Sequence, residues 1–246
     1  MRKTVLALVA TAVCMAITAG TAAASHSWGG YHWARTSNPF TVQLGDNVSG
    51  PWDSMFRTAS TDWSKSRVLD TSIVAGGTTA KRCSPTLGRV EVCSYNYGGV
   101  QWLGVASIWL ASGSTHIVQG TVKNNDFYFG GNSHYDYAYN NTAQMQHVIC
   151  QEIGHTFGLD HQDESGISLN TCMDYYHNTS ASDTKSTHLN AHDYEELEII
   201  YNHLDSTTTI GRAAFSPFGT TTRTSKVVAH LAGGARLITY TTWAGF

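Results

Sequence analysis

The segment from Cys150 to His161, which reads C-Q-E-I-G-H-T-F-G-L-D-H, constrains this chain more than any other part of the sequence. Side chains four positions apart lie on the same face of an α-helix, so residues 151 and 155 can reach one point above that face. Gly158 can take the left-handed conformation that ends a helix, and the returning chain would then bring His161 to the same point. The segment therefore predicts a helix from residue 142 to about residue 157, followed by a tight turn.

Four residues of this segment match a known signature. Glu152, His155, Gly158 and His161 stand where H-E-x-x-H-x-x-G-x-x-H, the zinc signature of the metzincin peptidases, requires them. Gln151 replaces the first histidine. The chain thus resembles a metzincin-type zinc metallopeptidase of the matrixin/astacin kind with one metal ligand changed. The resemblance implies that His155 and His161 bind Zn²⁺ and that Glu152 is the general base.

A second match surrounds Met173, which follows His161 by twelve residues. The stretch 171–175 reads T-C-M-D-Y, similar to the S-x-M-x-Y Met-turn of astacins and serralysins. The resemblance implies that Met173 forms an apolar floor beneath the metal. It also implies that Tyr175 lies close enough to contact the metal or the transition state.

The replaced histidine leaves the third metal ligand open. The Gln151 amide oxygen reaches about as far as a histidine ring nitrogen, but a neutral carbonyl oxygen suits harder cations than zinc, so we expect weaker zinc binding. His147 cannot share an ion with His155, because eight helical residues separate them by about 12 Å. His147 would instead orient the Gln151 amide or simply pack. Other side chains that could complete the site are Tyr175, Asp160, Asp163, His177 and His134.

The first 24 residues have the pattern of a secretory signal. Arg2 and Lys3 precede a mostly apolar run, and residues 22–24 are a small-residue cleavage site, although a retained N-terminal anchor is the alternative. We expect a secreted, extracellular protein with no later membrane span. The net charge of −3 and the lack of a basic block give no indication of nucleic acid or of an anionic membrane surface as a partner.

Four cysteines follow the predicted signal, and an even count in a secreted chain favours two disulfides. They allow three pairings. We favour a short-range disulfide Cys83–Cys93 and a second disulfide, Cys150–Cys172, that links the predicted metal helix to the segment after it. Free buried thiols are the alternative.

The order of elements predicts an α+β fold. Apolar periodicity indicates a helix after Pro51 and a last helix capped by Asn190, with Leu204 on its apolar stripe. Strands are expected at residues 40–44, 68–74, 90–95, 105–110 and 116–122, and as a hairpin or unstructured tail within 227–243. By resemblance, the fold is a metzincin-like catalytic domain: a twisted, mostly parallel sheet with an antiparallel edge strand, an active-site helix, a Met-turn and a C-terminal helix. The expected division is a signal (1–24), a catalytic domain (25–204) and a Thr/Ser-rich linker with a hairpin or tail (205–246).

These inferences favour a monomeric zinc endopeptidase that acts on protein or peptide substrates. By analogy with the family, residues 105–110 would be the edge strand that pairs with an extended substrate. The alternative is a catalytically impaired protein of the same fold that binds peptide or glycan without cleaving it. Gln151 favours this alternative, whereas Glu152, His155, His161 and the Met-turn favour the enzyme.

Overall fold

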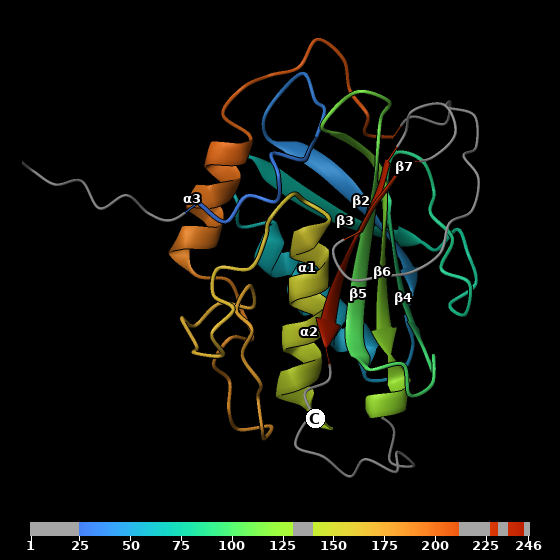
Figure 1. Cartoon of the computed structure of the whole chain (residues 1–246), viewed down its shortest axis with the longest axis vertical. Helices are drawn as coiled ribbons and strands as arrows, with labels where there is room; N and C mark the ends of the chain where they lie inside the picture. Colours follow the sequence, from blue (N-terminus) through green and yellow to red (C-terminus); the bar gives the residue numbers. More distant parts are fainter. Residues whose placement is uncertain (1–24, 130–139, 212–226, 231–235, 244–246) are drawn as a thin grey trace, which may run out of the picture.

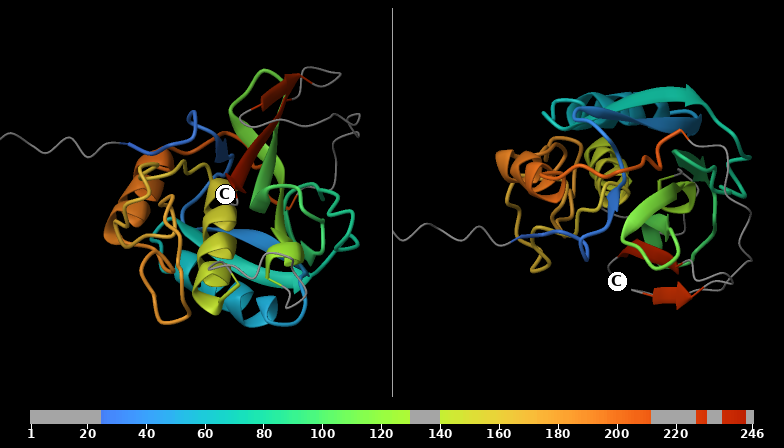
Figure 2. Two further views of the ribbon diagram at one scale, coloured as in Figure 1. Left: turned by 60° about the horizontal axis from the view of Figure 1, so that its bottom comes forward. Right: turned by 90° about the horizontal axis from the view of Figure 1, so that it is seen from above.

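The computed structural model describes residues 25–129, 140–211, 227–230 and 236–243. Within these residues the chain is a mixed α/β protein with three α-helices and one eight-stranded sheet (Figures 1 and 2). The predicted signal, residues 1–24, lies outside the described residues. The helices are α1 (Trp52–Trp63), α2 (Thr142–His155) and α3 (Ala191–Ile200), with a short 3-10 helix η1 (Asp126–Tyr128). The strands are β1 (His32–Trp33), β2 (Phe40–Asn47), β3 (Leu69–Ala75), β4 (Val90–Tyr95), β5 (Trp102–Leu110), β6 (His116–Asn125), β7 (Val227–His230) and β8 (Arg236–Trp243).

The strand order across the sheet is β3-β2-β4-β6-β5-β8-β7, and β1 pairs with the start of β6. The pairs among β1, β2, β3, β4 and β6 are all parallel. β5, β8 and β7 add an antiparallel section on the other side of β6. The described sheet is therefore mostly parallel, as the sequence predicts.

The antiparallel strand expected at the sheet edge lies inside the sheet instead. Residues 105–110 belong to β5, which has β6 on one side and β8 on the other. β8 follows β5 from Leu110, opposite Arg236, to Trp102, opposite Trp243 (Figure 1). The prediction of an open edge was wrong because the covering strand comes from more than 100 residues further along the chain, beyond the reach of local patterns.

Alternation along the chain explains why β2 forms where it does. Phe40, Val42 and Leu44 are buried, while Thr41 and Gln43 between them are exposed. In a strand, successive side chains point to opposite faces, so this pattern directs one face of β2 into the core.

The two flanking helices follow their predicted signals, with one correction. The predicted stripe of α1 faces the core through Trp52, Phe56, Ala59 and Trp63. The Asn190 side chain accepts a hydrogen bond from the Asp193 backbone in a capping box that starts α3. α3 ends at Ile200, so Leu204 lies beyond it and is 58% exposed rather than part of the apolar stripe.

α2 is fixed at the centre of the molecule by α1 and by the sheet. The indole nitrogen of Trp63 donates to the backbone oxygen of Cys150 at 3.2 Å, and its ring packs edge-on against Phe157. Both aromatic rings are fully buried. None of the described helices has the length and apolar character needed to cross a membrane.

Candidate metal centre

α2 carries three of the predicted site residues, and every residue of this helix after Thr142 is buried. Gln151, Glu152 and His155 are at most 1% exposed, which is unusual for polar and ionisable side chains. The side chain of Asn141 caps the helix by accepting from the Gln144 backbone at 2.9 Å. Buried polar groups are stable only when they are hydrogen-bonded or bind metals, so this concentration indicates a functional site.

The turn after α2 depends on glycine. Gly158 has φ +96°, in the left-handed region, and a Cβ atom there would lie 1.9 Å from the backbone oxygen of Tyr31. The Gly158 oxygen accepts from the Trp28 backbone at 2.7 Å. The N-terminal segment therefore crosses the turn so closely that no side chain fits, and the chain reverses toward His161 as predicted.

The reversal brings two histidines together. The Nε2 atoms of His155 and His161 lie 3.1 Å apart, close to the roughly 3.3 Å that separates two nitrogen ligands of one tetrahedral zinc ion. His155 Nδ1 donates to the Leu159 carbonyl at 2.9 Å, and His161 Nδ1 lies 3.2 Å from a carboxylate oxygen of Glu164. Because these oxygens accept hydrogen at Nδ1, the lone pairs at Nε2 are turned toward each other, as in metal-binding histidines. Burial lowers the pKa of His155 well below its usual value, and the nearby His161 lowers it further.

The Met173 segment is tied to this pair from two directions. The backbone NH of Gln162 donates to the Met173 oxygen at 2.7 Å. The disulfide Cys150–Cys172 joins α2 to the same segment, and Cys83–Cys93 is also bonded, so both predicted pairs are present. Met173 is fully buried, and a Cβ atom on Gly154 would lie 2.6 Å from its sulfur. Met173 thus packs directly under α2.

Tyr175 lies beside the histidine pair. Its ring packs edge-on against the His161 ring with 4.4 Å between centroids. Burial raises the pKa of Tyr175 to about 12, and the negative charge of Glu152 adds to the rise. The phenol therefore keeps its hydrogen at neutral pH and can act as a donor.

Gln151 is held by the segment that carries Tyr175. Its amide nitrogen donates to the backbone oxygen of Asp174 at 2.8 Å. Nε2 of His147 lies 2.9 Å from the same oxygen, and its Nδ1 lies 3.0 Å from the Asn178 side chain. His147 and Gln151 thus share one acceptor, which fixes the position of the Gln151 amide nitrogen.

Of the other ligands considered, Asp163 is directed elsewhere by local contacts, whereas Asp160 forms a group with His161 and Glu164 in which the possible ligand atoms all lie within 4.8 Å of one another. Asp160 accepts from the His161 backbone at 2.8 Å, and one oxygen of Asp163 accepts from the backbone and hydroxyl of Ser165. His177 is half-buried, and His134 lies outside the described residues.

Sequence reasoning missed two contributors to the site. Glu164 contacts the outer nitrogen of His161, and its position three residues after that histidine was the available signal. Gly104 on β5 lies against Glu152: a Cβ atom there would be 2.7 Å from the Glu152 side chain. No local pattern marks this second contact, because it joins a strand to a helix 48 positions away.

The chain matches no protein-family model and no curated protein sequence. Among solved structures it is similar to myroilysin, with a TM-score of 0.38 and 12% identity, over 72% of this chain and 98% of that one. A second myroilysin structure gives 0.37 and 10%, over 69% and 86% of the two chains. High choriolytic enzyme 1, a hatching-enzyme zinc protease from the medaka fish Oryzias latipes, gives 0.36 and 11%, over 70% and 94%. Because these TM-scores are low, no conclusion about fold or function rests on them.

Proposed function

We propose that this chain is an exported, monomeric zinc endopeptidase that acts on protein or peptide substrates. The observation that supports this best is the 3.1 Å separation of the buried His155 and His161 Nε2 atoms, with the outer nitrogen of each ring beside an oxygen. Two imidazoles in this arrangement fit zinc, and Gln151 would supply a weaker third donor through its amide oxygen. The signal pattern in residues 1–24 and the two disulfides support export.

The zinc ion and two side chains would divide the chemistry. Bound zinc would polarise the substrate carbonyl and make water more acidic at this site. Glu152, next to Gln151 on α2, would accept a proton from the attacking water and pass it to the departing amine. Tyr175, which keeps its hydrogen at neutral pH, would donate a hydrogen bond to the oxygen that becomes negative in the transition state.

Two observations favour the second candidate function, which is binding of peptide or glycan without cleavage. Gln151 occupies the position of a zinc-binding histidine, and its amide nitrogen is committed to Asp174. In addition, β8 pairs with β5 along the strand expected to bind an extended substrate. Both features would reduce hydrolysis while leaving the fold intact.

Metal content and cleavage, measured on the same purified protein, separate the two functions. For the enzyme we expect about one zinc per chain at this centre and cleavage of a mixed peptide library that a chelator abolishes. Glu152→Gln should keep the zinc and lose cleavage by roughly 10²–10⁴-fold, the usual contribution of a general base. Folded wild-type protein that neither binds zinc at this centre nor cleaves would overturn the peptidase and leave the binding function as the candidate. Unchanged cleavage in Glu152→Gln would remove Glu152 from the mechanism.

A further inference from the structure

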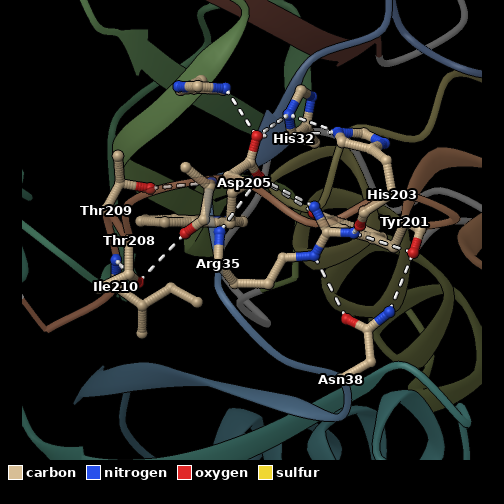
Figure 3. Close-up of polar contacts among 12 residues, drawn as sticks. His32, Arg35, Asn38, Tyr201, His203, Asp205, Thr208, Thr209 and Ile210 are labelled. Atoms are coloured by element: carbon tan, nitrogen blue, oxygen red, sulfur yellow. Dashed lines mark hydrogen bonds and ion pairs between the residues drawn. The ribbon is translucent and has the colours of Figure 1, made fainter.

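A second group of metal-binding side chains surrounds Asp205 (Figure 3). One carboxylate oxygen, Oδ1, lies 3.1 Å from Nε2 of His116, 3.7 Å from Nε2 of His32 and 3.9 Å from Nε2 of His203. The Nε2 atoms of His32 and His203 are 3.2 Å apart. Three imidazole nitrogens therefore converge on one carboxylate oxygen, and none of these residues belongs to the centre on α2.

The four residues come from three separate parts of the chain. His32 lies on β1 and His116 opens β6, and the two are paired in register. His203 and Asp205 follow the end of α3. The His32 ring packs edge-on against both other rings, with centroids 4.9 Å from His116 and 4.7 Å from His203. No motif joins these positions in the sequence, so only the fold brings them together.

Outer contacts orient two of these groups toward the cluster. His32 Nδ1 donates to the Gly30 carbonyl at 2.9 Å, which leaves the lone pair of this ring at Nε2. The other oxygen of Asp205, Oδ2, accepts from the backbone and guanidinium of Arg35 at 3.2 and 3.0 Å (Figure 3). Metal-binding side chains typically contact a carbonyl or a charged group through the atom that faces away from the metal. This contact fixes the ring tautomer of a histidine and the direction of a carboxylate.

The facing nitrogens of His32 and His203 can be joined either by one hydrogen or by one cation. Nε2 of His32 and Nε2 of His203 face each other at 3.2 Å, so at most one of them can carry a hydrogen there. A single cation between them would satisfy both lone pairs and the Asp205 carboxylate together. Side-chain exposure rises from 8% for His32 to 31% for His116 and 45% for His203, which gives an ion a path from solvent.

We infer that His32, His203 and Asp205, whose ligand atoms all lie within 4.8 Å of one another, form a second zinc site. Nε2 of His32 and Nε2 of His203 lie 3.2 Å apart and 3.7 and 3.9 Å from Oδ1 of Asp205, compared with about 3.3 Å between ligands of a tetrahedral zinc ion. Two imidazoles and one carboxylate are ligands that zinc prefers, and His116 lies 3.1 Å from the same carboxylate oxygen. A bound ion would join the N-terminal segment to the chain after α3.

Zinc content of purified full-length protein tests this inference independently of the proposed peptidase activity. The double variant His116→Ala/His203→Ala removes the ligand His203 and the neighbouring His116, the two more exposed histidines of the cluster. We expect it to hold about one zinc per chain less than wild type and to lose the rise in melting temperature that added zinc gives. His188→Ala is the matched control, because His188 is a 57% exposed histidine paired with a single carboxylate, that of Asp62. The control should keep the wild-type zinc content.

A second variant covers the case in which the double variant does not fold. His161→Ala removes a ligand of the centre on α2 and leaves the Asp205 cluster complete. We expect this variant to retain one zinc per chain and to remain stabilised by added zinc. Folded His161→Ala protein without zinc, or a folded double variant with the full wild-type content, would overturn the inference.

Discussion

Gly104 on β5 lies against Glu152 on α2 so closely that a Cβ atom at position 104 would be 2.7 Å from both Cγ and Oε1 of Glu152. Strand and helix can approach to this distance only because residue 104 has no side chain. The position of the proposed general base is therefore set by a glycine on a neighbouring strand.

Replacing Gly104 with alanine should displace Glu152. We expect a loss of about 1–3 kcal/mol in the free energy of unfolding, typical of an overpacked core. We also expect a fall in kcat/KM of roughly 100-fold, since a displacement of about 1 Å near the chemistry has this effect. Peptide cleavage and chemical denaturation measure the two quantities. Gly120→Ala on β6 is the control, because its nearest neighbour would be a Val90 methyl at 3.2 Å, without the 2.7 Å contacts that a Cβ atom at position 104 would make. Equal loss of activity in both variants would contradict a specific role for Gly104.

Gln151→His restores the histidine that the zinc signature of this segment requires. We expect zinc affinity to rise by about tenfold or more, equivalent to about 1.4 kcal/mol, because a third imidazole replaces a neutral amide oxygen. Competition against a zinc-chelating dye measures this change. If cleavage increases together with zinc affinity, the natural site is an impaired one. If cleavage is lost while zinc binds more tightly, Gln151 is a ligand suited to the reaction.

Glu164→Gln should weaken the metal centre without removing a ligand. The Glu164 carboxylate lies 3.2 Å from His161 Nδ1, and loss of such outer contacts typically costs about 10–100-fold in metal affinity or activity. Calorimetric zinc titration gives the affinity. Glu198→Gln is the control, because Glu198 is an exposed glutamate that pairs with the surface residue Arg67. Equal zinc affinity in Glu164→Gln and wild type would show that His161 is oriented by other groups.

Removal of residues 227–246 should open β5 for an extended peptide. β8 forms an antiparallel pair with β5, the arrangement by which peptides add to an exposed strand. If the chain is a peptidase, the truncated protein should show a lower KM for long peptides, by about tenfold, and little change for dipeptides that cannot pair. Removal of residues 244–246 alone leaves β8 whole and serves as the control. A folded truncated protein with unchanged KM would show that substrate does not use β5.

Much of the centre on α2 could be predicted from the sequence, since it depends on local rules. The helix predicted from residue 142 to about residue 157 and observed at Thr142–His155, and the reversal at Gly158, follow from spacing along one short segment. The approach of His155 to His161 is a consequence of that reversal. The capping of α3 by Asn190 is local in the same way. These features are determined by propensity and by the geometry of a few neighbouring residues.

Other features depend on contacts between segments far apart in the chain. The expected open edge at residues 105–110 is covered by β8, and the amide nitrogen of Gln151 is engaged by Asp174. The cluster around Asp205 joins residues from β1, from the start of β6 and from the segment after α3.

The sequence by itself thus determined the secondary structure around the metal-binding helix and the pairing of two histidines across its turn. Only the tertiary structure decided which strand is exposed, how the glutamine is oriented and where a second group of histidines meets. The physical reason is that local conformation depends on neighbouring residues, whereas strand pairing and convergent ligands depend on the packing of the whole chain.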